Sequence, residues 1–460
     1  MQDGCRNVSP PEKPKGNSGL HPGLVLLLTA ALFAAPLSAR TGKPGVTWGE
    51  WIEVAEGEAY RGPWRMNESD WRFVDDATVA ITEQGSVGVV WADQEKQDLF
   101  IQVVEPDGQA RFSEPVNISR SPDTFSWLPR VVMTSKEPEE IAVLWQEIIF
   151  SGGTHGGEIF FARSTDGGRS FSRPLNLSRT VAGAGKGRLT REIWFNGSLD
   201  LVRSRNSTLY AAWTVYEGTL HFSRSTDGGK SFSDPLLLEG GESNLPARGP
   251  SLAVYHDDVW LAWAVGEKQD ADIFYTVSRD GGQTFSKPRK AVESTGHSEA
   301  PKLAVDEGGI VHLLYGESPA GLMQSYHIRH ASTEDDGGFG ASREISGGHS
   351  DRFESVNFPY LALDESKNLY VAWELFPDSK IRSRGLGFTF SDDRGKTFAP
   401  PSVVPGTLDN ELGFNGSQQG LYMDKLAVNG KGDLAVVNCT FKPNESSHIR
   451  LIRGSVEKKE

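Results

Sequence analysis

Polar and aromatic residues recur at two fixed offsets from the short apolar strands of this 460-residue chain. One offset, two residues before the Pro position that opens a strand, holds Asp75, Trp127, Arg248, Glu299 and Tyr422. The other, two residues past the aromatic end of a strand, holds Glu147 and Glu317. Two carboxylates within reach of each other can transfer protons at a glycosidic bond, or hold Ca²⁺ through hard oxygen ligands. The repetition therefore predicts a polar site at whichever surface gathers these positions.

The strands that must position these residues also repeat. Short apolar runs end at Trp91, Trp145, Trp213, Trp263, Tyr315 and Trp373, and a seventh run ends near Asn438. Each unit reads as three short strands, a turn motif and a fourth strand, which is the pattern of a β-propeller blade. Seven units predict an all-β propeller with seven four-stranded blades, and six blades are the alternative. The last unit is one strand short, and Trp48–Val54 is the strand expected to close the ring.

An eight-residue motif, S-x-D-x-G-x-[ST]-F, lies in phase with these strands. It occurs at Ser164–Phe171, Ser225–Phe232, Ser278–Phe285 and Ser391–Phe398, and degenerate copies occur at Ser332–Phe339 and Glu105–Phe112. Its Asp-Gly step favours a hairpin turn, because Gly accepts positive φ and Asp bonds nearby backbone amides. The motif resembles that of the Asp-box (BNR repeat) β-propellers, which include the sialidases, and the resemblance covers about Arg61 to Glu460. It implies that Asp166, Asp227, Asp280 and Asp393 are structural residues of peripheral turns.

The resemblance to sialidases also implies a site. In those enzymes three arginines bind the sugar carboxylate, an aspartate is the acid/base, and a tyrosine activated by a glutamate is the nucleophile. Arg248-Gly249-Pro250 is similar to the R-I-P motif that supplies one arginine, and the other candidates for the clamp are Arg72, Arg130, Arg191 and Arg352. The catalytic candidates are Tyr422, Glu317 and Asp75. The candidates for further substrate contacts are Glu147, Glu299, Trp127 and Trp194.

Composition limits the partners and the location. A formal net charge of −14 argues against nucleic acid, because phosphate binding needs a basic face. The apolar segment Leu24–Ala39 ends in small residues and is short for a membrane span. It predicts a signal peptide (residues 1–39) before a single propeller domain (residues 40–460), and an uncleaved anchor is the alternative. The two cysteines, Cys5 and Cys439, would leave the mature chain without a disulfide, and the isolated histidines predict no zinc site.

Two hypotheses of function follow. The first is a secreted, periplasmic or extracellular propeller that binds a glycan or glycoconjugate at the mouth of its channel, with a protein as the other partner considered. It requires no cofactor, although its carboxylates could hold Ca²⁺. The alternative is an exo-sialidase or other glycoside hydrolase that uses an arginine clamp and a Tyr/Glu pair. Clustered arginines at the mouth would favour the enzyme, whereas carboxylates and aromatic residues without them would favour the binding protein.

Overall fold

The computed structural model describes residues 45–65, 67–121, 124–148, 157–180, 183–188, 194–216, 218–238, 245–266, 270–334, 337–347, 352–379, 382–415 and 423–456. Only the backbone is described for Gly187 and for residues 194–196, so the side chain of Trp194 is not placed. The predicted signal segment Leu24–Ala39 and the candidates Arg191 and Tyr422 lie outside the described residues. Within these ranges, no helix has the length and apolar character needed to cross a bilayer.

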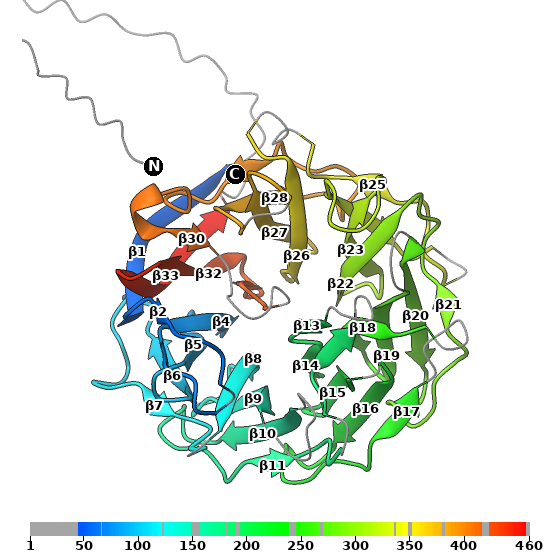
Figure 1. Ribbon diagram of the computed structural model, residues 1–460. Helices are drawn as coiled ribbons and strands as arrows, with labels where there is room; N and C mark the ends of the chain where they lie inside the picture. Colours follow the sequence, from blue (N-terminus) through cyan, green and yellow to red (C-terminus); the bar gives the residue numbers. More distant parts are fainter. Residues whose placement is uncertain are drawn as a thin grey trace, which may run out of the picture. The chain divides into compact units, whose positions relative to one another are not determined.

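Antiparallel sheets stand in a ring, each with its first strand innermost and its fourth strand outermost (Figure 1). The first three blades are β4 (Val74–Ile81), β5 (Val87–Asp93), β6 (Asp98–Val104) and β7 (Val116–Asn117); β8 (Phe125–Met133), β9 (Ile141–Ile148), β10 (Glu158–Ser164) and β11 (Leu175–Asn176); and β14 (Leu199–Arg203), β15 (Leu209–Thr214), β16 (Leu220–Ser225) and β17 (Leu236–Leu238). The next three are β18 (Ala247–Tyr255), β19 (Asp258–Val265), β20 (Asp272–Ser278) and β21 (Arg289–Lys290); β22 (His297–Val305), β23 (Val311–Ser318), β24 (His327–Ser332) and β25 (Arg343–Glu344); and β26 (Ser355–Leu363), β27 (Leu369–Phe376), β28 (Leu386–Ser391) and β29 (Ser402–Val403).

The seventh blade joins the two ends of the described chain. Its first three strands are β31 (Leu426–Val428), β32 (Asp433–Lys442) and β33 (Ser446–Val456), and β1 (Val46–Gly57) pairs with β33 as the outermost strand. β30 (Phe414–Asn415) also pairs with β32. The predictions of seven four-stranded blades and of ring closure by Trp48–Val54 are confirmed. This pairing covers a sheet edge that would otherwise be open.

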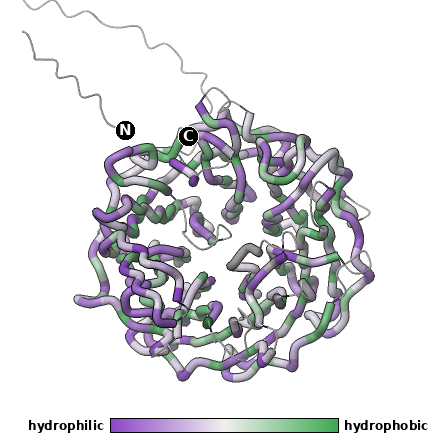
Figure 2. Tube along the Cα trace, in the orientation of Figure 1, coloured by the Kyte–Doolittle hydropathy of each residue, from purple (hydrophilic) through white to green (hydrophobic). Residues whose placement is uncertain are grey.

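Apolar residues fill the space between neighbouring blades, so hydrophobic segments recur around the whole ring (Figure 2). The Trp near the end of the second strand in five of the blades lies deep in this packing. Trp145, Trp213, Trp263 and Trp373 are at most 1% exposed. Because each buried aromatic side chain stabilises the fold by about 2–3 kcal/mol, these interfaces hold the blades in fixed relative positions.

A β-bulge interrupts the innermost strands near the point where they begin. The pairing shifts between Asp75 and Thr78 in β4, and between Trp127 and Arg130 in β8. The bulge residue has positive φ in five of the innermost strands. These residues are Asp76 in β4, Leu128 in β8, Gly249 in β18, Ala300 in β22 and Phe358 in β26. A bulge bends its strand and re-aims the adjacent side chains, and the polar residues of the candidate site lie beside these bulges.

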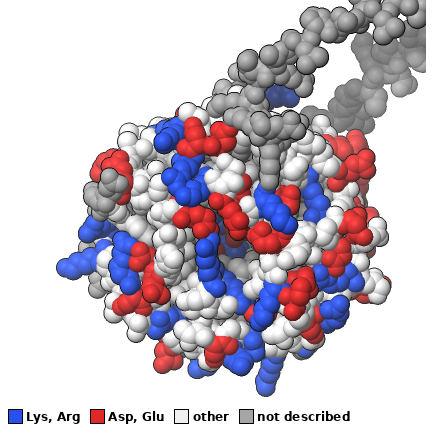
Figure 3. All heavy atoms as spheres, turned by 180° about the vertical axis from the view of Figure 1, so that it is seen from behind, with Lys and Arg blue, Asp and Glu red and all other residues white. Residues whose placement is uncertain are grey.

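The repeated motif forms the turn between the third and fourth strands. Asp166 accepts hydrogen bonds from Ser164 Oγ (2.7 Å) and from the backbone N–H of Ser170 (3.0 Å). Equivalent bonds fix Asp227, Asp280 and Asp393. These carboxylates are therefore engaged within their own turns. On the face of the molecule shown in Figure 3, acidic and basic side chains are interspersed rather than segregated by sign.

Candidate functional site

The face at which the innermost strands begin is called the mouth. The hairpin of β2 (Tyr60–Arg61) and β3 (Trp71–Arg72) precedes β4 at this face. Trp64, in the loop of the hairpin, is 42% exposed, and its ring centroid lies 4.9 Å from that of Trp71 and 5.8 Å from that of Trp127. The rings of Trp71 and Trp127 are nearly parallel, at 6°, and both are buried. Trp64 thus offers an aromatic surface to solvent on a rigid buried base.

One arginine lies beside this aromatic group, and a second interacts electrostatically with the first. Arg61 Cζ is 4.7 Å from the centroid of the Trp71 ring. Arg382 follows β27 in sequence and is close enough to Arg61 for the two charges to repel. Partial burial lowers the pKa of Arg61, whereas burial and then repulsion by Arg61 lower the pKa of Arg382. Asp75 opposes both shifts. Because two neighbouring guanidinium groups repel each other, a bound anion would stabilise the pair.

A chain of hydrogen bonds connects the carboxylate beside the arginines to the aromatic group. Gln94 Nε2 donates to Asp75 Oδ1 (3.1 Å), and Trp127 Nε1 donates to Gln94 Oε1 (2.9 Å). The bulge residue Asp76 is fully buried, and neither of its carboxylate oxygens has a hydrogen-bond partner among the described residues. Burial, reinforced by the charge of Asp75, raises the pKa of Asp76 well above its usual range. The environment therefore favours the neutral acid at Asp76.

Below the mouth, ionic side chains meet across the axis of the ring. Arg130 Nε, from β8, lies 3.5 Å from Asp424 Oδ2 and 3.9 Å from Asp200 Oδ1. Lys302 Nζ, from β22, contacts Asp424 Oδ1. Arg130 and Asp200 are buried, where charges attract strongly although removing them from water is costly, whereas the side chain of Asp424 is 35% exposed. This network links the second, third, fifth and seventh blades.

A second network lies in and between the sixth and seventh blades. Tyr360 Oη donates to Glu374 Oε1 (2.8 Å), and Lys425 Nζ contacts the same oxygen. All three side chains are at most 1% exposed. Burial and then the charge of Glu374 raise the pKa of Tyr360 well above its usual value. A tyrosine nucleophile must lose its proton, so this arrangement, in which Lys425 already neutralises the glutamate, does not activate Tyr360.

Arg248 belongs to a third buried network, which links the fourth, fifth and sixth blades. Arg248 Nη1 donates to the carbonyl oxygen of Gly266 (2.6 Å), and its Nη2 lies 2.9 Å from His297 Nε2 and 3.8 Å from Glu299 Oε2. Asn357 Nδ2 donates to Glu299 Oε1 (2.8 Å). The structure therefore brings together Arg248 and Glu299, two residues that share the predicted offset from Pro.

The two glutamates of the other predicted offset have local partners. Glu147 accepts hydrogen bonds from Ser126 Oγ (2.7 Å) and Trp145 Nε1 (2.8 Å), and burial raises its pKa. Glu317 Oε2 lies 3.1 Å from Arg329 Nε. Both carboxylates stabilise the end of a second strand within their own blade.

The described arginines of the predicted clamp lie in different surroundings. Arg130 and Arg248 are buried in the two separate networks given above. Arg72 Nη1 pairs with Glu58 Oε2 (2.8 Å) at the hairpin, and Arg352 is exposed. The arginine pair of the mouth consists instead of Arg61 and Arg382.

Sequence reasoning missed several residues of the mouth and of the networks below it. Trp64 and Arg382 lie in loops, and Arg61 in the short strand β2, and none of these segments carries a periodic signal. Tyr360 and Lys302 could have been found, because both directly follow the Pro position that the repeats PYLAL and PKLAV align. Reading the repeat at the position directly after the Pro would have gathered Arg130, Lys302, Tyr360 and Lys425.

Comparisons with known proteins bear on the fold. No family model and no curated protein matches this sequence. A polysaccharide lyase described as an ulvan lyase bound to -[GlcA(1-4)Rha3S]- has a TM-score of 0.51 and 11% identity, over 82% of this chain and 94% of its own. The polysaccharide lyase Uly1 also has a TM-score of 0.51 and 11% identity, over 88% of this chain and 99% of its own. The chain shares its fold with these lyases.

A NanB sialidase variant from Streptococcus pneumoniae is similar at a TM-score of 0.44 and 10% identity, over 71% of this chain and 68% of its own. The propeller fold that the Asp-box resemblance implied is confirmed by the seven blades. At these identities the likeness concerns the fold, so function must be argued from the site.

Proposed function

We propose that this propeller binds an acidic saccharide at its mouth. The observation that carries the proposal is Trp64, which is 42% exposed, rests on Trp71 and Trp127, and has Arg61 and Arg382 nearby. A pyranose ring presents a face of C–H groups that can stack on an indole. A sugar carboxylate or sulfate can accept the forked, charge-assisted hydrogen bonds of a guanidinium group.

Hydrolysis of such a saccharide is the second candidate function. Two observations favour it. The mouth has an arginine pair, as expected of the enzyme, and Asp76 is a buried carboxyl group without a hydrogen-bond partner among the described residues, a kind of group that concentrates at functional sites. The state of Tyr360 favours binding instead, because the tyrosine is held in its protonated form next to a glutamate that is paired with Lys425. Binding is therefore the function that we propose.

A location outside the cytoplasm is part of the proposal. The apolar segment Leu24–Ala39 has the length and the small-residue end of a secretory signal. Secretion would bring the mouth into contact with extracellular or envelope polysaccharides.

Calorimetric titration with sialylated, glucuronate-containing, sulfated and neutral oligosaccharides tests the proposal. The wild type should bind at least one acidic oligosaccharide, and Trp64→Ala should weaken its binding about tenfold or more, since stacking of a ring ligand contributes about 1–3 kcal/mol. Leu237→Ala is the matched control, because Leu237 is 59% exposed but lies on β17 at the outer edge of a blade.

Variants of the arginine pair test the specificity for acidic ligands. Arg61→Gln and Arg382→Gln should weaken binding of the acidic oligosaccharide and leave any neutral binding unchanged. Release of reducing ends, or of a fluorophore from a sialoside, would favour the hydrolase. Absence of saccharide binding by the wild type, or equal affinities of wild type and Trp64→Ala, would rule out the proposed site.

A further inference from the structure

In several blades, a phenylalanine of the turn motif packs against the preceding blade. The contact region between two neighbouring blades is called a seam. The ring of this Phe meets, edge to face, an aromatic side chain from the third strand of the preceding blade. The centroid distances are 4.8 Å for Phe161 with Phe232, 4.9 Å for Phe222 with Phe285 and 5.1 Å for Tyr275 with Phe339. In two of these seams a second-strand ring stacks on the third-strand ring, as Tyr210 does on Phe222 (6.0 Å) and Trp260 on Tyr275 (5.7 Å).

In the seam between the fifth and sixth blades, two histidines occupy these positions. His330 of β24 pairs with Leu314 of β23 in the register, as Phe222 pairs with Ala212 in the third blade. Phe398 of the sixth-blade turn meets His330 at 5.2 Å, and His312 stacks on His330 at 5.4 Å. His312 Nδ1 and His330 Nε2 are 3.1 Å apart, so one imidazole donates a hydrogen bond to the other.

The hydrogen bond requires that at least one of the two imidazoles is uncharged, and burial disfavours a charge on either ring. Two imidazolium rings have no acceptor nitrogen, so double protonation removes the hydrogen bond between them. Both side chains are at most 3% exposed, and His312 Nε2 has no hydrogen-bond partner among the described residues. Burial lowers the pKa of His312 to about 4 and the pKa of His330 to about 3.

The surrounding charges give little help to a protonated pair. Asp306 favours the charged form of His312, whereas Arg394 opposes it. His312 and then Arg343 oppose the charged form of His330. Two arginines, one from each side of the seam, thus face the pair against a single carboxylate.

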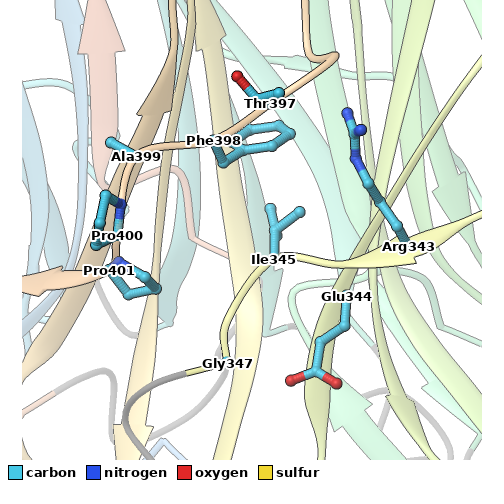
Figure 4. Close-up of a pocket in the computed structure, with 9 residues that line it drawn as sticks. All are labelled: Arg343, Glu344, Ile345, Gly347, Thr397, Phe398, Ala399, Pro400 and Pro401. Carbon is cyan, nitrogen blue, oxygen red and sulfur yellow. The ribbon is translucent and has the colours of Figure 1, made fainter. Parts of the chain in front are cut away.

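A cavity at the same seam gives the turn room to move. It has a volume of about 520 Å³ and is lined by Arg343, Glu344, Ile345, Gly347, Thr397, Phe398, Ala399, Pro400 and Pro401. Phe398 lies between Arg343 and Pro400 at its edge (Figure 4). The Phe398 ring therefore borders open space on one side. On its other sides it packs against the buried cluster that includes Trp373, and Arg343 Cζ lies 5.4 Å from its centroid, so its release would break only these contacts and the one with His330.

We propose that the seam between the fifth and sixth blades is an acid-sensitive joint, in which protonation of the His312–His330 pair releases the turn that carries Phe398. The other seams with aromatic pairs hold their turns with rings that do not titrate in this range. Acid would thus loosen the ring at one defined place. The inference does not depend on the proposed saccharide site, which lies at the mouth.

Hydrogen exchange of the wild type, followed by mass spectrometry at pH 7.5 and pH 5 and corrected for the intrinsic rates, tests the joint. In the locally open form His312 has its usual pKa of 6.5, whereas in the folded form its pKa is about 4. At pH 5 this difference should raise the population of the open form about 30-fold. The effect should appear in His327–Ser332 and Ser391–Phe398. It should be absent from Glu158–Ser164 and Ser225–Phe232, the matched segments of the second and third blades, which meet through Phe161 and Phe232 and contain no histidine. Equal responses in the two seams would overturn the proposal.

A double variant in which aromatic residues replace both histidines provides the matched comparison. His312→Tyr with His330→Phe reproduces the Tyr210 and Phe222 pair and should abolish the acid response of the seam. Retention of the full response in this double variant would also overturn the proposal. Should the double variant fail to fold, the comparison of the two seams in the wild type decides.

Discussion

Glu374 offers a quantitative test of the buried charges below the mouth. Its Oε1 accepts a hydrogen bond from Tyr360 Oη (2.8 Å) and contacts Lys425 Nζ, and both Glu374 and Lys425 are at most 1% exposed. The substitution Glu374→Gln removes the negative charge but keeps the shape of the side chain. It leaves the Lys425 ammonium buried without its counter-charge, which costs about 3–5 kcal/mol in comparable buried pairs.

This loss should be visible as a shift in thermal unfolding. With an unfolding entropy of about 2.1 cal/mol/K per residue over roughly 400 residues, a loss of about 3–5 kcal/mol lowers Tm by about 4–6 °C. Differential scanning calorimetry at pH 7 measures it directly. Glu53→Gln is the control, because Glu53 pairs with His448 and Arg450 at 45% side-chain exposure, and an exposed pair contributes less than about 1 kcal/mol.

A double variant separates charge pairing from simple disruption. Glu374→Leu with Lys425→Met replaces both charges by apolar groups, which in other proteins is often neutral or stabilising. We expect it to recover most of the stability lost in Glu374→Gln. A Tm change of less than 1 °C in Glu374→Gln, or a double variant less stable than the single one, would refute the reasoning.

Three further predictions concern single residues or segments. Because burial raises the pKa of Asp76, the wild type should lose stability as pH rises from about 4 through the folded-state pKa. Chemical unfolding between pH 4 and pH 8 should show that Asp76→Asn lacks this loss. Parallel pH profiles of stability for the two proteins would contradict the prediction. Asp166→Ala removes the acceptor of hydrogen bonds from Ser164 and Ser170. It should lower the free energy of unfolding by about 1–2 kcal/mol and leave saccharide affinity unchanged. A loss of affinity at normal stability would argue against a structural turn. Sequencing of the mature N-terminus should find cleavage near Ala39 in a secretion-competent host, whereas a retained Leu24–Ala39 segment would indicate an anchor.

The blade pattern was predictable because propeller blades repeat. The aromatic ends of the second strands, such as Trp145 and Trp263, mark one blade each, and they are buried for the same reason in every blade. The missing strand of the last blade followed from counting, and β1 supplies it by pairing with β33. Local pattern and ring closure agree, which is why the fold could be read from the sequence.

The site was predictable only where it follows the repeat. Asp75 and Trp127 share an offset, and the structure connects them through Gln94. Arg61 and Arg382 have no such relation, because Arg61 belongs to the short β2–β3 hairpin and Arg382 to the loop after β27, more than 300 residues away in sequence. Ring closure brings them within range of electrostatic repulsion. Contacts of this kind depend on the curvature of the whole ring and leave no local signal.

The most direct test of the account is a crystal structure of the protein with the acidic oligosaccharide that it binds most tightly. We expect a sugar ring on the exposed surface of Trp64, with its carboxylate or sulfate between Arg61 and Arg382. A saccharide bound instead in the cavity beside Phe398, or elsewhere away from the mouth, would contradict it.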